Sequence, residues 1–127
     1  MTYKLAIPFR LPGLNEYTDA NRRSPYEGAK LKEKTQDMIA VHIRKQFRGV
    51  RITKPVTLSY LWIECNRKRD KDNIAFAQKY VQDALVRTGV LTNDGWDQVV
   101  GFDHKFGIDR EKPRVIVLIK EVDKEEA

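Results

Sequence analysis

The chain has only one cysteine and two histidines among its 127 residues, which excludes several kinds of site. Cys65 has no second cysteine with which to form an internal disulfide, and no CxxC pair can hold a structural zinc ion. His42 and His104 lie far apart and lack HExxH spacing, so we expect each to be structural or exposed rather than a metal ligand. A glycine-rich phosphate loop is also missing from the sequence.

Long apolar stretches are missing too, since no run approaches the roughly 20 residues that cross a bilayer as a helix. The first residues (MTYKLAIPFRLPG) lack the apolar core and cleavage site of a signal peptide, so we expect a cytoplasmic protein. The length suits one domain over residues 1–127, with residues 121–127 as a flexible tail. With 41% hydrophobic and 33% charged residues, the composition is that of an ordinary globular protein.

Positive charge is in excess along the chain. Lysine and arginine total 24 against 18 acidic residues, which gives a net charge of +6. Such a surplus favours an anionic partner, nucleic acid above all. Part of it lies on one face of an expected helix over residues 24–48, although a charged helix face is most often simply solvated. The cations on that face are Lys30, Lys32, Lys34, Arg44, Lys45 and Arg48.

Four segments have the apolar or alternating pattern of β-strands. In the longest, Val56, Tyr60 and Trp62 fall on one face, and Glu64 ends the same row. We expect Glu64 to be an exposed strand-end residue rather than a further acidic group of a site. The expected strands cover residues 3–7, 55–65, 98–102 and 114–119.

Two long helices are expected between these strands. A serine followed by proline begins one of them at Ser24, and Gly49 ends it. The second runs from about residue 72 to residue 88, and Gly89 follows it in the position that favours a left-handed conformation. The polar residues 15–23, which precede the first helix, are expected to form a loop.

The most unusual stretch is residues 67–73 (RKRDKDN), which separates a strand from the second helix. Asp70 and Asp72 stand one residue apart in it, among cationic and amide side chains. Two carboxylates at such a junction suit a hard divalent cation such as Mg²⁺, which takes oxygen ligands and needs only one or two protein carboxylates. The surrounding cations suit a phosphate-rich substrate. The simpler alternative is an acidic turn in which Asp72 caps the helix.

A third acid, Asp94, lies in the polar turn after the second helix. Only the tertiary arrangement can bring it to the aspartate pair, and sequence alone does not fix that arrangement. A calcium-binding EF-hand loop is excluded, because its fifth and sixth positions would be Ile74 and Ala75. A phosphatase-type aspartate pair would follow the strand directly, whereas residues 67–69 intervene here.

The aspartate pair belongs to a longer pattern of motifs between residues 69 and 100. Its parts are residues 69–73 (RDKDN), 79–85 (KYVQDAL), 89–90 (GV), 93–94 (ND) and 98–100 (QVV), with a weaker match at 12–15 (PGLN). Together they resemble the RusA family of Holliday junction resolvases, which is often carried by prophages.

The resemblance implies an α+β fold, a single small domain with a mixed β-sheet and two main helices. It implies a homodimeric endonuclease that uses Mg²⁺ or Mn²⁺ to cut four-way DNA junctions during DNA recombination and repair. Metal binding and catalysis are assigned by it to Asp70, Asp72 and Asp94, and a further catalytic role is assigned to Lys79.

Two departures from the family pattern concern the third acid. Asn93 stands where a neighbouring aspartate is common, which lowers the expected metal affinity. Residues 95–97 (GWD) lengthen the approach to the next strand, so Asp97 competes with Asp94 as the third ligand.

The third departure concerns the lysine. Lys79 follows Asp72 by seven residues instead of the family's four. Along one continuous helix, that spacing corresponds to roughly 10 Å rather than roughly 6 Å. Lys71 and Lys105 are therefore the reserve candidates for the catalytic cation.

Two functions of other classes remain open on the sequence. One is a non-catalytic module that binds DNA or junctions and uses its acids for caps and ion pairs. The other is a metal-dependent enzyme that acts on a smaller phosphate ester.

Overall fold

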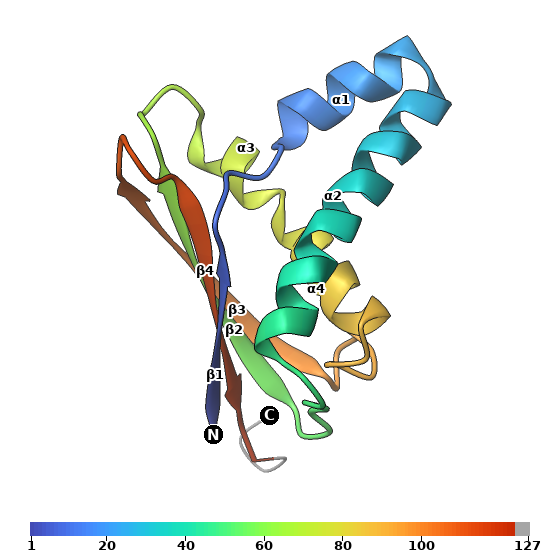
Figure 1. Ribbon diagram of the computed structural model, residues 1–127, viewed down its shortest axis with the longest axis vertical. Coiled ribbons are helices and arrows are strands. Elements are labelled where there is room, and N and C mark those ends of the chain that lie inside the picture. The colour runs from blue at the N-terminus through green and yellow to red at the C-terminus, as the bar shows by residue number, and fades with distance from the viewer. Residues whose placement is uncertain (124–127) are drawn as a thin grey trace.

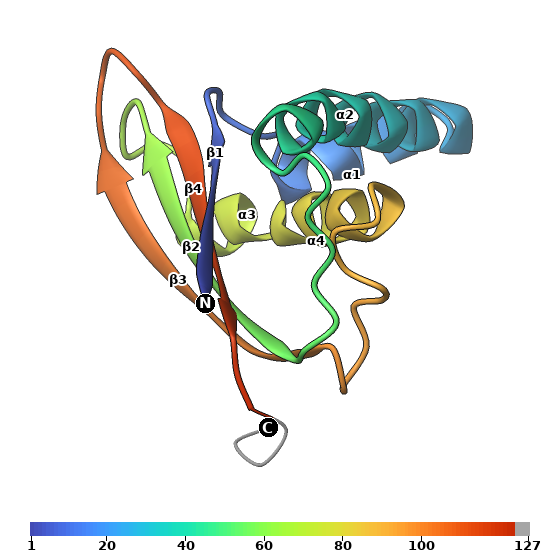
Figure 2. The ribbon, with the colours of Figure 1, turned by 60° about the horizontal axis from the view of Figure 1, so that its bottom comes forward.

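The structure, a computed structural model, describes residues 1–123 and contains one four-stranded sheet in the order β1-β4-β2-β3. The helices of this part of the chain lie together on one face of the sheet (Figures 1 and 2). The elements follow one another as β1 (Thr2–Ile7), α1 (Leu14–Arg23), α2 (Pro25–Gln46), β2 (Val56–Glu64), α3 (Lys71–Ala75), α4 (Gln78–Arg87), β3 (Val99–Ile108) and β4 (Arg114–Glu121).

The sheet is mixed, because β2 pairs antiparallel with β4 and parallel with β3, while β1 pairs antiparallel with β4. A mixed sheet with its helices segregated to one face is an α+β fold, as predicted. Within residues 1–123, no helix has both the length and the apolar composition needed to cross a membrane.

The core lies between the sheet and the helices, and the alternation in β2 is confirmed. Val56, Tyr60 and Trp62 face the helices and are buried. Glu64 ends the same row and is also buried, with 5% of its surface exposed, so the prediction of an exposed strand-end glutamate is wrong. The helices contribute Ile39, Ile43, Tyr80, Val81, Ala84 and Leu85 to the same cluster.

Helix α1 occupies the segment that was predicted to be a polar loop. Its first turn is closed by two side chains. Glu16 accepts a hydrogen bond from the Gly13 N–H at 3.0 Å, and Asn73 Oδ1 accepts one from the Asn15 N–H at 2.8 Å. The prediction is wrong because the second of these caps comes from a residue 58 positions along the chain.

The predicted helix over residues 72–88 is broken into α3 and α4. At the break, the Ala77 N–H bonds to the carbonyl of Ile74 and the Tyr80 N–H to that of Ala77, so these bonds span three residues instead of four. Phe76 lies at the break, with its ring edge-on to Tyr80 at a centroid distance of 5.8 Å. The burial of Ala77 and the packing of Phe76 thus fix a turn that helical periodicity did not reveal.

Other helix ends agree with their local signals. Ser24 Oγ accepts a hydrogen bond from the Glu27 N–H at 3.1 Å, so α2 begins as predicted. Gly89 follows α4 with a φ of 81°, a conformation that glycine adopts without steric cost. Helix α2 ends at Gln46, shortly before Gly49 with its φ of 69°.

Two strands are longer than predicted. β3 was expected to end near residue 102 and continues to Ile108. β4 was expected to end at residue 119 and continues to Glu121, which pairs with Val56 in the sheet. The Val122 N–H bonds to the Pro55 carbonyl. The prediction of a flexible tail is therefore wrong for residues 121 and 122. The rest of the predicted tail, residues 124–127, lies outside the described residues.

Candidate functional site

A buried ion pair fixes the loop that carries the aspartate pair. Arg69 donates from Nε to Glu64 Oε1 at 2.9 Å and from Nη2 to Glu64 Oε2 at 2.8 Å. Its Nη1 also donates to the Leu11 carbonyl and to Glu16. Burial alone would lower the pKa of Arg69, but the two glutamates outweigh it and raise that pKa. Glu64 is therefore a structural anchor, and the loop is tied to the end of β2 and to the N-terminal segment.

The aspartate pair lies at the start of α3, and both side chains are exposed. Asp70 occupies the N-cap position, yet its side chain makes no capping hydrogen bond within the described residues. Asp72 lies inside the first turn rather than at the cap, and its Oδ1 accepts a hydrogen bond from the Asn73 N–H at 2.9 Å. The alternative that Asp72 is the N-cap residue is therefore wrong, although its carboxylate does bind a backbone N–H of the first turn.

Asn73 joins the two regions that carry the family resemblance. Its side chain is 7% exposed and caps α1 through the Asn15 N–H, as described above. Gly13 lies directly beneath it, because a Cβ added at Gly13 would come within 2.5 Å of the Asn73 carbonyl oxygen. Residues 12–15 and 69–73 thus form one packed unit behind the aspartate pair.

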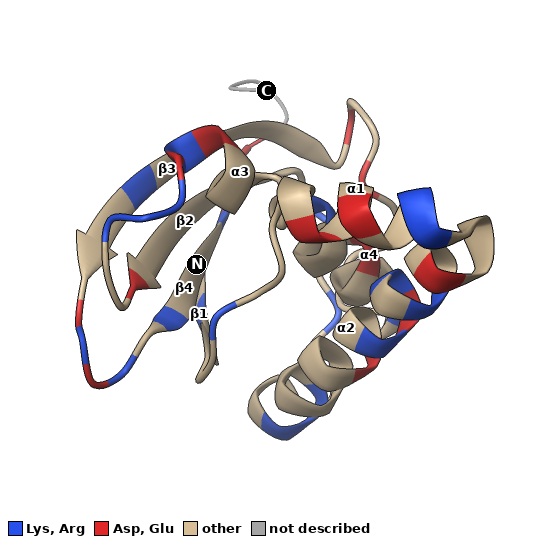
Figure 3. Cartoon of the chain, turned by 90° about the horizontal axis from the view of Figure 1, so that it is seen from above, with Lys and Arg blue, Asp and Glu red and all other residues tan. Residues whose placement is uncertain are grey.

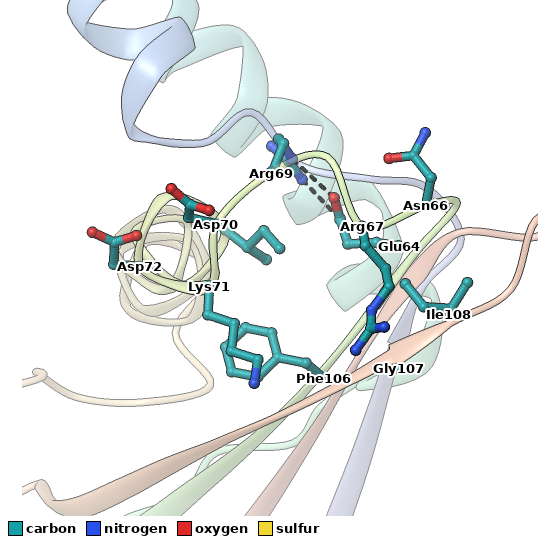
Figure 4. Close-up of a pocket in the computed structure, with 11 residues that line it drawn as sticks. Glu64, Asn66, Arg67, Arg69, Asp70, Lys71, Asp72, Phe106, Gly107 and Ile108 are labelled. Atoms are coloured by element: carbon teal, nitrogen blue, oxygen red, sulfur yellow. Dashed lines mark hydrogen bonds and ion pairs between the residues drawn. The ribbon is translucent and has the colours of Figure 1, made fainter.

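A hollow of about 480 Å³ opens beside the pair, between α3 and the end of β3 (Figure 4). Lys71 and Arg67 extend along it, and the Lys71 Nζ lies 5.6 Å from the centre of the Phe106 ring. Asp70 and Asp72 project from the other side of α3 in this view. The hollow is lined by Glu64, Asn66, Arg67, Arg69, Asp70, Lys71, Asp72, Ile74, Phe106, Gly107 and Ile108.

Lys79 and Asp94, predicted to act together, are neighbours in the structure. The Lys79 Nζ lies 3.9 Å from Asp94 Oδ2 and 3.2 Å from Asp83 Oδ1. Asp94 also lies near Tyr60, whose pKa is raised by burial and by the charge of that carboxylate. Because α4 begins anew after the break, the seven-residue spacing between Asp72 and Lys79 is not a spacing along one helix.

The three predicted metal ligands are not gathered in one place. Asp94 lines a different depression, which also contains Trp96 and Phe102. Within residues 1–123, no three acidic, histidine or cysteine side chains lie close enough together to hold a metal ion. The exposed pair Asp70 and Asp72 is the remaining arrangement that suits Mg²⁺, which needs only one or two protein carboxylates and keeps several waters.

The excess positive charge is spread over several elements. Figure 3 shows lysine and arginine on the helices, on the sheet and on the loops, with acidic residues between them. On α2, Lys32 pairs with Asp83 at 3.7 Å, and Lys30 lies 6.0 Å from the centre of the Tyr26 ring. Cations of α2 thus alternate with acidic and aromatic neighbours. This arrangement agrees with the prediction that this face of the helix is a solvated charged surface.

His104 is structural, one of the two roles expected for it. Its Nδ1 accepts a hydrogen bond from Trp62 Nε1 at 2.9 Å, and its ring stacks on Tyr60 at 5.2 Å. Burial lowers the pKa of His104, while the charge of Asp103 offsets part of that effect. The neutral imidazole is the form that can accept the bond from Trp62.

The sequence did not predict that Phe106 and Arg67 belong to the candidate site. Both residues line the hollow together with Asp72. A signal was available, since the row Phe102, His104 and Phe106 continues the period-two pattern of a strand beyond residue 102. That continuation predicts a longer β3, whose far end would reach the aspartate loop.

Protein-family models give no match to this chain. A comparison with curated proteins likewise gives no significant match. The resemblance to the RusA family therefore stays a prediction that rests on its motifs.

Proposed function

We propose that the protein is a metal-dependent endonuclease that cuts four-way DNA junctions by hydrolysis of phosphodiester bonds. The observation that carries this proposal is the exposed pair Asp70 and Asp72 at the start of α3, beside a hollow that Arg67 and Lys71 line. Lys79, on the following helix, lies 3.9 Å from Asp94. As an enzyme of cellular DNA, it would act in the cytoplasm.

Asp70 and Asp72 are the residues that would hold Mg²⁺ or Mn²⁺, since carboxylate oxygens are the ligands that these hard cations take. A cation bound there supplies an activated water and neutralises charge on the phosphodiester. The resemblance adds Asp94 as a third ligand. That assignment stays a prediction, because Asp94 contacts Lys79 in the structure instead.

The protein's own cations would bind and orient the DNA backbone. Arg67 and Lys71 line the hollow beside the aspartate pair, where they can contact phosphate oxygens. Lys79 would offset the negative charge that develops on the reacting phosphate, the role in which a fixed cation contributes most to catalysis. The bidentate contact of Arg69 with Glu64 keeps the loop in place and leaves Arg69 out of the chemistry.

The test is incubation of the protein with a labelled four-way junction, with and without Mg²⁺, beside a linear duplex of equal length. We expect paired symmetric cuts in the junction only when the metal is present, and little cutting of the duplex. Tight binding without metal-dependent cleavage would instead identify a junction-binding module. Hydrolysis of a nucleotide phosphodiester but not of the junction would identify an enzyme for smaller substrates.

A further inference from the structure

Trp96 is a large aromatic side chain that the fold leaves in solvent. It is 95% exposed, whereas the other tryptophan, Trp62, is 1% exposed in the core. An aromatic ring stabilises a protein mainly through the area that it buries, so the indole of Trp96 adds little to the stability of this fold. An exposed tryptophan of this kind suits a role in binding, where such rings contribute much of the affinity.

The turn that carries Trp96 is closed by backbone hydrogen bonds. It lies between α4 and β3 (Figure 1). The N–H groups of Gln98 and Val99 both donate to the Gly95 carbonyl, at 3.1 and 3.0 Å. Trp96 therefore projects from an ordered turn, and a ligand that binds to its ring does not have to order the backbone first.

The depression beside Trp96, with a volume of about 310 Å³, combines aromatic rings with polar groups. Phe102, at 53% exposure, lines it together with Asp94 and Gln82. Gln82 Oε1 accepts a hydrogen bond from the Tyr60 hydroxyl at 3.3 Å, which leaves the amide N–H groups of Gln82 as donors for a ligand. The lining thus offers two aromatic rings, one donor group and one acceptor group.

A cation borders this depression. The Lys79 Nζ lies 3.9 Å from Asp94 Oδ2, and the Lys79 side chain is 58% exposed. A ligand whose apolar part enters the depression can therefore place an anionic group next to the ammonium. Lysine contacts of this kind position a nucleic-acid backbone through its phosphate oxygens.

This combination of groups matches a nucleobase. The face of a base stacks on tryptophan or phenylalanine, and its sugar is attached to an anionic phosphate. The edge of a base carries the donors and acceptors that Gln82 and Asp94 can pair with. A purely apolar segment of a protein would instead cover those two side chains and leave them without hydrogen bonds, which is costly.

We propose that the depression binds one unpaired base of a DNA strand, stacked on Trp96, with Lys79 at an adjacent phosphate. The choice of DNA rests on the proposed function, whereas the stacking surface rests on the exposure of Trp96 and on the groups around it. The faces of a paired base are covered by its neighbours, so the surface favours unpaired strands over an intact duplex. Any of the four bases can occupy it, because each has an aromatic face.

The test compares two single strands that differ only in their bases. One is an oligothymidine of about 12 nucleotides, and the other is an abasic strand with the same number of phosphates. Both are titrated in EDTA, so that no metal-dependent cleavage takes place. Since the phosphate contacts are alike, the ratio of the two dissociation constants reports contacts with bases. We expect the wild type to bind the oligothymidine at least about fivefold more tightly, the lower limit for one stacked base.

Replacement of the ring should remove this preference. Trp96→Ala is expected to bring the ratio to about one, while its affinity for the abasic strand stays within about twofold of the wild type. Trp96→Phe keeps an aromatic ring and should retain part of the preference. Tyr26→Ala, which removes a 69% exposed ring from α2, is the matched control and should leave the ratio unchanged. Circular dichroism melts establish that each variant is folded.

Tryptophan fluorescence gives an independent measurement. In the free protein, acrylamide should quench mainly Trp96, because Trp62 is buried. Saturating oligothymidine should protect Trp96 from the quencher, and the abasic strand should protect it less. Equal protection by the two strands would contradict stacking on this ring.

Three results of the titrations would overturn the proposal. They are no binding of either strand, equal affinity of the wild type for both, and a Trp96→Ala protein that is weakened equally for both. An unchanged ratio together with an altered mass in light scattering would assign Trp96 to a contact between protein chains instead. Junction cleavage is scored separately, since a protein that shows the preference but never cuts refutes the nuclease proposal alone.

Discussion

At the scale of single residues, Asn73 is the link that holds the candidate site together. Its side chain caps α1 through the Asn15 N–H, although it lies 58 residues further along the chain. It also lies against Gly13, where no Cβ would fit. A motif that the sequence presented as part of a metal site therefore also supports the fold. Asp72 supports the same residue, since its Oδ1 accepts a hydrogen bond from the Asn73 N–H at 2.9 Å.

Removing the Asn73 side chain is expected to destabilise the protein. Asn73→Ala leaves the Asn15 N–H without its cap, and we expect the free energy of unfolding to fall by about 1–2 kcal/mol. Urea denaturation measures the change. Asn66→Ala, which removes an exposed amide from the same loop, is the control and should cost markedly less. Equal losses would show that the contact with α1 contributes nothing particular.

The histidine beside Trp62 gives a prediction about pH. Burial lowers the pKa of His104, so the unfolded chain binds this proton more readily than the folded protein does. The stabilising contribution is present above the ordinary value of 6.5 and is lost as the pH falls through the lower value in the folded protein. We expect the free energy of unfolding to decline between about pH 7 and pH 5 for this reason.

Thermal or urea denaturation across that range, at fixed protein concentration, measures this contribution. His104→Gln keeps an acceptor for Trp62 but cannot titrate, so its stability should depend less on pH than that of the wild type. His42 is present in both proteins, so any contribution from it cancels in the comparison. An identical pH dependence in the two proteins would contradict the assignment.

At the scale of elements, a turn between α3 and α4 lies between the aspartate pair and Lys79. In one continuous helix, the lysine would lie roughly 10 Å along the axis from Asp72. The turn at Phe76 and Ala77 keeps right-handed helical dihedrals, with backbone bonds that span three residues instead of four. In the structure Lys79 pairs with Asp83 and Asp94, so its role toward the aspartate pair is a prediction that mutation tests.

Lys79→Ala is expected to lose most cleavage, about 100-fold or more, while it keeps its fold and its affinity for the junction. Lys79→Arg should recover only a little, because a planar guanidinium does not replace a compact ammonium group. Cleavage rates under single-turnover conditions measure both. Lys34→Ala, which removes an exposed cation from α2, is the control. If Lys79→Ala cuts normally and Lys71→Ala does not, the catalytic cation lies in the loop.

The comparison between sequence and structure also belongs to this scale. The faces of β2, the start of α2 at Ser24 and the end of α4 at Gly89 were predictable, because neighbouring residues supply their signals. Helix α1 was not predictable, since its cap comes from Asn73, far along the chain. The break at Phe76 was not predictable either, since the tertiary packing of its aromatic ring fixes it. For the site, the aspartate pair was visible in the sequence, whereas the burial of Glu64 depends on its contact with Arg69.

At the scale of the whole molecule, the net charge of +6 should govern binding to DNA. Contacts between cations and phosphates release counterions, so junction affinity is expected to fall steeply as salt rises. Arg67→Ala should lower the slope of log affinity against log salt by about 0.9, the contribution of one phosphate contact. Titrations at several salt concentrations measure the slope. An affinity that does not change with salt would show that the charge plays no part in binding.

The homodimer that the family resemblance implies would carry two aspartate pairs related by symmetry. A four-way junction has two strands to cut in equivalent positions, which suits such a dimer. The positions of the cuts test this expectation.

The most direct test of the account is junction cleavage and junction binding by Asp72→Asn, measured side by side with the wild type in Mg²⁺. We expect cleavage to fall by at least about 100-fold, with binding equal or slightly tighter, because the change removes a metal ligand and one negative charge. Asp70→Asn should behave alike, and Asp37→Asn, an exposed carboxylate on α2, should cut normally. Cleavage by Asp72→Asn within tenfold of the wild type would contradict the central claim.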